Sequence, residues 1–190
     1  MPTIVAHAVA GVAIAQAVAP CSRRAEISLF AAGCAMLPDI DVLGFRFGIH
    51  YGDFFGHRGF THSLVFAALV AATVTMFLRH KDLKGDLQVL LCLFLATASH
   101  GVLDAFTNGG LGVAFFAPFD RTRYFFPIRP IAVSPLDLGA FLTRRGAAVL
   151  ISELKWVWMP SLALFAAARI FRCRARGSTQ GAASRVTWSF

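Results

Sequence analysis

Five apolar segments, separated by short polar stretches, constrain the fold of this chain more than any other feature. Hydrophobic residues make up 57% of the sequence and charged residues only 15%, whereas soluble domains carry about 25% charged residues. A helix of about 20 apolar residues crosses the hydrocarbon core of a bilayer, because all of its backbone polar groups are satisfied internally. The pattern predicts an all-α integral membrane bundle of four to five helices, over Ile4–Ala19, Ile27–Leu37, Phe60–Leu78, Leu87–Phe106 and Trp156–Ile170.

The lengths of these segments leave some boundaries open. The second is too short to cross a bilayer alone, so we expect it to be half-inserted or extended at either end, and the last could begin near Ala147. The first has no basic stretch before it and is followed by Arg23 and Arg24, which favours a retained helix over a cleaved signal peptide. Residues 1–176 are expected to form one membrane-embedded domain, and the polar residues 177–190 a mobile tail.

The net charge of +8 does not indicate nucleic-acid binding in this chain. Basic residues lie mostly between and after the apolar segments, where they face anionic headgroups and set the orientation of the protein. The sequence has no basic groove pattern interleaved with aromatic residues, so membrane lipids are the expected partners and no stable nucleic-acid partner is expected. The four cysteines contain no Cys-x-x-Cys pair and indicate neither a zinc finger nor a redox motif: Cys21, Cys34, Cys92 and Cys173.

Three polar clusters interrupt the apolar sequence, at Pro38–Asp41, His57–Ser63 and His100–Asp104. Carboxylates and imidazoles are costly to bring near hydrocarbon, so their presence indicates a function. His and Asp are also ligands of divalent metals. If all five segments cross the membrane, the three clusters and His7 meet at one face.

The distribution of basic residues gives an orientation for that face. Arg23, Arg24 and the basic residues after the last segment lie at the opposite face, which the positive-inside rule makes cytoplasmic. In a bacterium the protein would then lie in the inner (cytoplasmic) membrane with the clusters facing outward. Five arginines weaken the orientation without affecting the convergence of the clusters, because they lie on the same side as the clusters: Arg121, Arg123, Arg129, Arg144 and Arg145.

His100 and Asp104 are four residues apart on an expected helix, so their side chains lie on one face about a turn apart. This spacing lets both reach a single ion. The alternative is a buried His–Asp hydrogen bond that locks two helices together.

Asp39 and Asp41 project to the same side if the stretch after Pro38 is extended. Two carboxylates held that close repel each other unless a cation lies between them or one holds a proton. The alternative is a turn motif at a helix end.

The segment His57–Ser63 is the densest cluster, and Gly56 and Gly59 are expected to bend it. Thr61 is placed to cap the helix that follows. Helix N-termini attract anions, so Arg58, Thr61 and Ser63 could hold a phosphate or carboxylate. His57 and His62 would supply nitrogen ligands to a metal. The alternative is a belt of His and Arg at headgroup level.

Four further polar residues each have two possible roles. His50 and Asp53 are either ligands or loop residues, and Arg121 and Arg123 bind either an anionic substrate or headgroups. The stretch Thr107–Pro135, which contains Arg121 and Arg123, is too long for a simple connector, and loops of this length often cover a site.

The order and spacing of these motifs resemble the YdjM-like family of membrane-bound metal-dependent hydrolases. The resemblance covers roughly residues 1 to 130 and is carried by His7, Leu-Pro-Asp-Ile-Asp (37–41), His-Arg-Gly-Phe-Thr-His-Ser (57–63), Ser-His-Gly-Val-Leu-Asp (99–104), Thr-Asn-Gly-Gly (107–110) and Pro118-Phe119. It implies a metal-dependent hydrolase without naming a substrate. The family is distantly similar to zinc-dependent phospholipase C, all-helical enzymes that cluster several zinc ions with His and Asp, which would imply a phosphoester substrate.

Together these patterns predict a membrane-bound metal-dependent hydrolase acting on a phosphoester of a lipid or lipid-linked substrate. One to three divalent ions, with zinc as the expected metal, would be held by His7, Asp39, Asp41, His57, His62, His100 and Asp104. Arg58, Thr61 and Ser63 would steady the substrate anion, and Asp41 is a candidate general base. Two alternatives remain open, a metal-ion or proton transporter and a structural membrane protein whose His–Asp network locks helices together.

Overall fold

A computed structural model describes residues 1–78, 83–135 and 138–185, without the side chains of Leu138 and of the residues after Arg172. Its helices are α1 (Ile4–Val18), α2 (Arg24–Met36), α3 (Leu64–Phe77), α4 (Leu83–Ala105), α5 (Leu138–Phe141), α6 (Arg144–Glu153) and α7 (Met159–Arg185). Short 3-10 turns are η1 (Cys21–Arg23), η2 (Leu37–Phe47) and η3 (Phe60–His62), and η4 (Leu154–Trp158) is a π-helical turn. The described residues form no strand, only two isolated bridges within 107–131. The predicted all-α class is confirmed.

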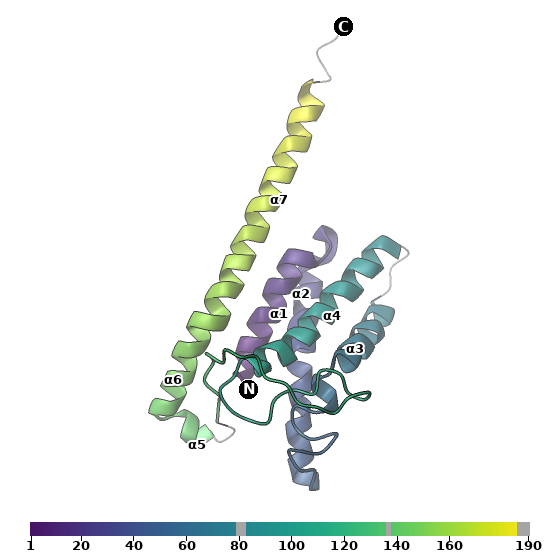
Figure 1. Ribbon diagram of the computed structural model, residues 1–190. Helices are drawn as coiled ribbons and strands as arrows, with labels where there is room; N and C mark the ends of the chain where they lie inside the picture. The colour runs from purple at the N-terminus through teal and green to yellow at the C-terminus, as the bar shows by residue number, and fades with distance from the viewer. Residues whose placement is uncertain (79–82, 136–137, 186–190) are drawn as a thin grey trace.

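The long helices run up and down in alternation (Figure 1). Helices α1, α2 and α4 pack against one another, α3 packs on α4, and α7 packs along α1. The beginnings of α1 and α3 and the ends of η2 and α4 therefore lie at one end of the bundle, together with the loop 107–135. The predicted convergence of the polar clusters is confirmed, and we call this the cluster end.

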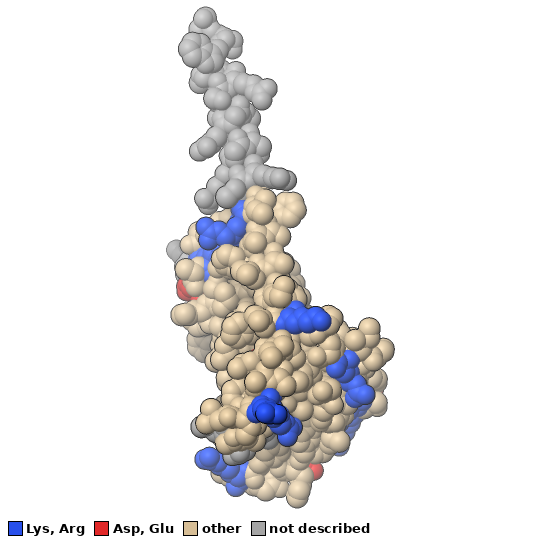
Figure 2. All heavy atoms as spheres, turned by 90° about the vertical axis from the view of Figure 1, so that its left-hand side faces the viewer, with Lys and Arg blue, Asp and Glu red and all other residues tan. Residues whose placement is uncertain are grey.

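Three helical segments are long and apolar enough to cross a membrane: Cys21–Phe47, Leu83–Ala105 and Arg144–Arg172. The short second apolar segment gains its length because η2 continues α2, as expected for a segment that needed extension. The last segment begins at Arg144, since α6, η4 and α7 follow one another without a break. The face covered by α6 and α7 is mostly uncharged, with a few separate Lys and Arg groups along it (Figure 2).

The basic residues at the opposite end are only partly described. Arg23 and Arg24 lie beside the α1–α2 connection, as the topology predicts. Arg79 and Lys81 lie outside the described residues. The backbone of α7 continues to Arg185, and the expected mobility of the tail 177–190 stays a prediction.

Small residues fill the contacts between α1, α2 and α4, as in other membrane helix pairs where close backbone approach replaces bulky packing. Gly11 of α1 marks the closest approach to α2. A Cβ atom at this position would lie 2.6 Å from the carbonyl oxygen of Ala31 and 2.8 Å from Cβ of Ala35. Because Ala35 and the following η2 bear on the polar cluster, this contact helps to set its geometry.

A buried carboxylate fixes the beginning of α1. Glu153, fully buried at the end of α6, accepts hydrogen bonds from the backbone N–H of Thr3 and, at 2.7 Å, from its hydroxyl group. The Thr3 hydroxyl oxygen in turn caps α1 by accepting from the N–H of Ala6. This ties the first turn of α1, which carries His7, to the last membrane segment.

We predict opposite effects of the same substitution at two helical glycines. Gly11→Ala should lower stability by about 1–3 kcal/mol, because the added methyl group meets backbone atoms of α2 that cannot rotate away. Gly33→Ala on α2 is the control, since its Cβ would meet nothing within 4 Å and alanine favours the helix by about 0.5–1 kcal/mol. Thermal unfolding in detergent tests both, and equal stability of the two variants would contradict the close α1–α2 contact.

Candidate metal centre

Five parts of the chain bring polar side chains together at the cluster end. His7 comes from α1, Asp39 and Asp41 from η2, His57 and Arg58 from the loop before η3, His62 from η3, and His100 and Asp104 from α4. All eight side chains are buried. The sequence placed these residues at one face, and the structure joins them in one cluster.

Asp41 is the centre of the hydrogen bonding in this cluster. Its Oδ1 lies 2.8 Å from Nδ1 of His57, and its Oδ2 accepts from the hydroxyl of Thr61 at 2.6 Å. Oδ2 also lies 3.2 Å from Nδ1 of His62 and accepts from the backbone N–H of Arg58 at 3.3 Å. With both oxygens occupied, Asp41 orients two imidazoles, and it does not belong to the groups of free atoms described below.

The local segment that carries Asp39 and Asp41 differs from the prediction. It is 3-10 helical rather than extended, because η2 continues α2 through Pro38, which is tolerated in the first turn where no N–H bond is needed. The two carboxylates therefore do not project to the same side. Asp41 Oδ1 lies 2.8 Å from Nδ1 of His57, and Asp39 Oδ1 lies 3.2 Å from Nε2 of His100.

Hydrogen bonds fix the tautomers of three histidines. A carboxylate and a backbone carbonyl can only accept, so Nδ1 carries the proton in His57 and His62, which face Asp41, and in His100, whose Nδ1 lies 2.7 Å from the carbonyl oxygen of Ala35. In the neutral form of each ring, Nε2 then carries a free lone pair. Metal-binding histidines use their second nitrogen in this way.

Buried polar atoms without a hydrogen-bond partner accumulate in this cluster. Buried side-chain polar groups nearly always have a partner, so a concentration of exceptions indicates a missing ion or water. The cluster atoms without a hydrogen bond are both ring nitrogens of His7, both carboxylate oxygens of Asp39 and of Asp104, Nε2 of His62 and of His100, and Nε of Arg58. Two of them, Nε of Arg58 and Oδ2 of Asp104, form an ion pair with each other at 2.9 Å.

The distances between these atoms distinguish an ion site from direct hydrogen bonding. Nε2 of His100 and of His62 lie 3.2 and 3.8 Å from Oδ1 of Asp39, and Nε2 of His62 lies 3.5 Å from Oδ2 of Asp104. Most of these exceed a hydrogen bond. They match the edge of about 3.3 Å between ligands that each lie 2.0–2.1 Å from one zinc ion in a tetrahedron.

Three overlapping groups of ligand atoms, each within 4.8 Å of one another, can hold a metal ion: His7, Asp39 and His100; Asp39, His57 and His62; and His62, His100 and Asp104. The rings of His7 and His100 are stacked, with their centroids 3.6 Å apart. Because the groups share members, the geometry allows more than one ion. The donor set therefore fits a divalent metal.

Charge leads to the same conclusion. The buried cluster contains three carboxylates and one guanidinium group, which leave a net charge of −2 when the histidines are neutral. A buried uncompensated charge costs several kcal/mol. One divalent cation would neutralise the cluster.

Arg58 is placed differently from its predicted role. Its side chain is fully buried, with Nε 2.9 Å from Oδ2 of Asp104, and its terminal nitrogens donate to the carbonyl of Gly109 at 2.8 Å and the hydroxyl of Thr107 at 2.9 Å. The left-handed backbone of Arg58 (φ 64°) turns this side chain inward. The guanidinium therefore joins Asp104 to the loop 107–135 and has no exposed atom to offer to a substrate.

The structure places Thr61 and Ser63 differently from the prediction. Ser63 is the N-cap of α3, where its Oγ accepts from the N–H of Phe66 at 3.1 Å, so the prediction that Thr61 caps this helix is wrong. The Thr61 hydroxyl is committed to Asp41 instead. The cause is the 3-10 turn η3, which delays the start of the helix by one turn.

Other residues considered in the sequence lie outside the cluster. The His50 side chain is 89% exposed and lies 3.6 Å from the carboxylate of Asp53. Arg123 donates to the carbonyls of His57 and Tyr51 at 2.9 and 3.1 Å, so it supports the loop that carries His57. Arg121 lies over the ring of Phe54, 5.0 Å from its centroid.

Two further residues contribute to the cluster, Thr107 from the Thr-Asn-Gly-Gly motif and Tyr51, to which the sequence assigned no role. Thr107 donates to the carbonyl of Asp104 and accepts from Arg58. The Tyr51 ring lies edge-on to His57, with centroids 5.1 Å apart. A Cβ atom on Gly110 would lie 2.6 Å from the Tyr51 hydroxyl and 2.8 Å from Arg58, which explains the second glycine of Thr-Asn-Gly-Gly.

His62 lies outside the membrane segments, and its surroundings change its protonation. Burial alone would lower its pKa, but the carboxylates of Asp104 and Asp41 outweigh burial and raise the pKa to about 9. In the metal-free protein the His62 imidazolium therefore supplies part of the missing positive charge. A metal that takes Nε2 must displace this proton.

We predict that metal binding releases a proton near neutral pH. Below pH 9 the free site holds a protonated His62, so zinc binding at pH 7.5 should release about one proton from this residue, and the apparent affinity should rise with pH up to about 9. Calorimetric titrations in buffers of different ionisation enthalpy measure the release. Binding without proton release would show that Nε2 of His62 is not a ligand.

A second prediction separates Thr61 from Ser63. Thr61→Val removes the hydroxyl that holds Asp41, so metal affinity should fall about 10- to 100-fold, as for other groups that orient ligands. Ser63→Ala should cost about 1 kcal/mol of stability through the lost cap and leave metal affinity unchanged. Competition with a chromophoric chelator and thermal unfolding test the pair, and a reversed pattern would contradict these roles.

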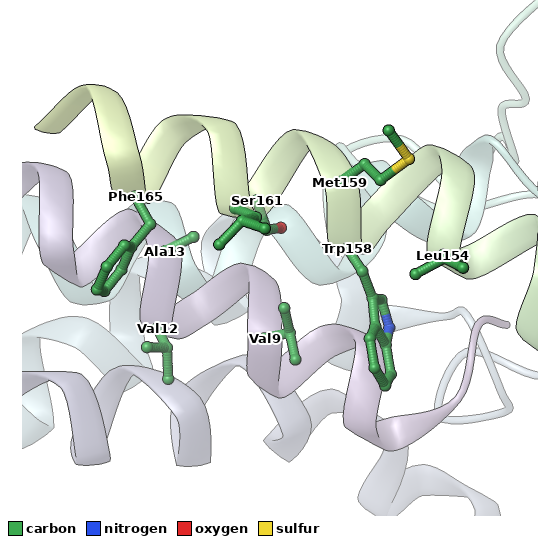
Figure 3. Close-up of a pocket in the computed structure, with 9 residues that line it drawn as sticks. Val9, Val12, Ala13, Leu154, Trp158, Met159, Ser161 and Phe165 are labelled. Carbon is green, nitrogen blue, oxygen red and sulfur yellow. The ribbon is translucent and has the colours of Figure 1, made fainter.

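A separate apolar pocket of about 330 Å³ lies between α1 and the segment η4–α7, away from the cluster (Figure 3). Val9, Val12 and Ala13 line one side, and Trp158, Ser161 and Phe165 are on the other. It contains no residue of the cluster and lies on two membrane segments. This pocket therefore does not lead a ligand to the cluster.

Fold and cluster together define a helical integral membrane protein with a buried His/Asp site that can hold a metal ion. The chain matches the family described as YdjM inner membrane protein over residues 1–176, and it belongs to that family. It is 42% identical to the inner membrane protein YbcI of Escherichia coli (strain K12) over 166 residues, which cover 86% of this chain and 95% of the relative. It is 30% identical to the protein YvsG of Bacillus subtilis (strain 168) over 118 residues, covering 57% and 70% of the two chains. No solved structure matches the chain. The predicted family and inner-membrane location are confirmed.

Proposed function

We propose that this protein is a metal-dependent hydrolase of the inner membrane that cleaves a phosphoester of a lipid or lipid-linked substrate. One observation carries the proposal: the unpartnered lone pairs of His62, His100, Asp39 and Asp104 converge at distances suited to a shared cation. Nitrogen-rich donor sets with carboxylates favour zinc.

The residues with free donor atoms are His7, Asp39, His57, His62, His100 and Asp104. Six donors exceed one tetrahedral zinc, which favours two or three ions or a division between ligands and supporting residues. Asp41 is a positioning residue in this proposal, because it acts through the Nδ1–H groups of His57 and His62.

A bound divalent ion supplies Lewis acidity and a water of near-neutral pKa. The protein's own part is to hold the donors rigidly: Asp41 and the Ala35 carbonyl fix three imidazoles, and Arg58 fixes Asp104. Burial of the cluster removes competing water and strengthens each of these electrostatic contacts. A hydrolytic site with a preorganised polar environment needs this rigidity.

The membrane setting favours a lipid or lipid-linked substrate. The cluster lies at one end of the bundle, near the ends of the apolar segments, where the phosphate groups of lipids are found (Figure 1). The outward orientation remains part of the proposal and rests on the positive-inside rule. A transporter would need such groups near the middle of the membrane rather than at one end.

We predict that purified wild-type protein contains stoichiometric zinc or another divalent metal and hydrolyses phosphoester probes such as p-nitrophenyl phosphate or phosphatidic acid in vesicles. His62→Ala and Asp104→Asn should each lose the metal and at least about 100-fold of the turnover, because they remove donors from overlapping groups. Elemental analysis and phosphate release measure the two effects.

His50→Ala is the matched control, because it removes an exposed imidazole outside the cluster and should change neither quantity. Circular dichroism and gel filtration show whether each variant is folded. Wild-type protein that binds no metal even after supplementation would overturn the proposal and favour a polar network that only locks helices together.

A further inference from the structure

A pocket of about 470 Å³ opens directly beside the cluster, within the range of small-molecule sites. Its walls come from the loop 51–57, the loop 107–135, the α5–α6 region and the chain start. The lining residues are Met1, Tyr51, His57, Gly110, Val133, Ser134, Pro135, Ala140 and Arg145. His57, a candidate metal-binding histidine whose side chain is buried, forms part of the pocket wall.

The lining contains one cationic side chain, Arg145 in the first turn of α6, and the N-terminal amine of Met1, which lies 4.0 Å from Oδ1 of Asp104. The backbone N–H of Arg145 donates to the Thr143 hydroxyl oxygen that caps this helix, and its side chain is exposed. In the described part of the chain Arg145 forms no ion pair. Arg58, Thr61 and Ser63 are occupied by Asp104, Asp41 and the start of α3, so they leave anion binding to another group.

The other lining residues indicate which second chemical group a ligand would carry besides an anion. The side chains of Met1, Val133, Pro135 and Ala140 are apolar, and the Tyr51 hydroxyl lies near Arg58 at the pocket wall. A ligand that suits both parts carries an anionic group and an apolar chain. A guanidinium pairs with a phosphate through two parallel hydrogen bonds, which a single ammonium cannot reproduce.

We propose that this pocket is the substrate site, in which Arg145 binds the phosphate of an amphiphilic phosphoester and places its phosphorus beside His57. The assignment rests on the proposed function for the reaction at the cluster. It makes Arg145 a substrate-binding residue and names the substrate class as a phosphoester with an apolar chain next to the phosphate.

Binding of hexyl phosphate, a short-chain phosphomonoester, tests the assignment on the detergent-solubilised, full-length protein. Isothermal titration should give a dissociation constant at least about tenfold weaker for Arg145→Gln than for wild type, since hydrogen bonds to charged groups have this magnitude. Arg145→Lys should bind with intermediate strength, and hexanol should bind equally weakly to all variants.

Arg144→Gln is the matched control, because it removes the same charge one residue away from a side chain that does not line the pocket. It should change the dissociation constant by less than twofold. If Arg144→Gln and Arg145→Gln weakened hexyl phosphate binding equally, the effect would come from general surface charge and the assignment would be overturned. Wild-type protein that does not bind hexyl phosphate would also overturn it.

The measurement separates this assignment from the proposed function, because metal content and turnover are determined on the same samples. Metal and turnover in wild type, with binding unaffected by Arg145→Gln, would reject the pocket and keep the hydrolase. Binding that depends on Arg145 in a protein without metal or turnover would keep the pocket as an anion site and reject the hydrolase.

Discussion

Buried negative charge at one end of the bundle is the constraint on which the rest of this structure depends. Asp39, Asp41 and Asp104 are all removed from water, and each must be compensated where it lies. Asp41 is compensated by hydrogen bonds from Thr61 and two imidazoles, and Asp104 in part by Arg58. Asp39 retains two oxygens without a hydrogen-bond partner, and it is the point at which a cation is most needed. The fold brings these compensating groups together from segments that are far apart in the sequence.

This arrangement divides the protein into two regions with different packing. Between the helices, alanines and Gly11 allow backbones to approach closely, and no charge has to be accommodated. At the cluster end, side chains with hydrogen bonds replace this packing, and loops can be irregular because Arg58, Thr107 and Arg123 satisfy their carbonyl groups or hold them in place. Glu153 connects the two regions by holding the start of α1 from the last membrane segment.

Much of this could be predicted from the sequence, because apolar periodicity and the position of polar clusters at segment ends are local properties. They gave the five helical segments, the shared end of the bundle and the residues that meet there, including His7 and Asp104. Which of several adjacent polar residues takes which role could not be predicted. Whether Thr61 or Ser63 caps α3, and whether Arg58 points inward, depends on η3 and on one positive φ angle, which have no signature in residue type. Arg145 and Tyr51 line the pocket beside the cluster only because of the tertiary fold, as Glu153 reaches Thr3 across 150 residues.

The length of α1 has a consequence for the membrane itself. Its 15 residues span about 22 Å, whereas the hydrocarbon layer is about 30 Å thick. α3, with 14 residues, has nearly the same shortfall. Both helices begin at the cluster end, and a bilayer accommodates helices this short by thinning around them. Under the proposed function, thinning at the cluster end would shorten the path of a lipid phosphate to the cluster, and the shape of the bilayer would become part of how the protein meets that substrate.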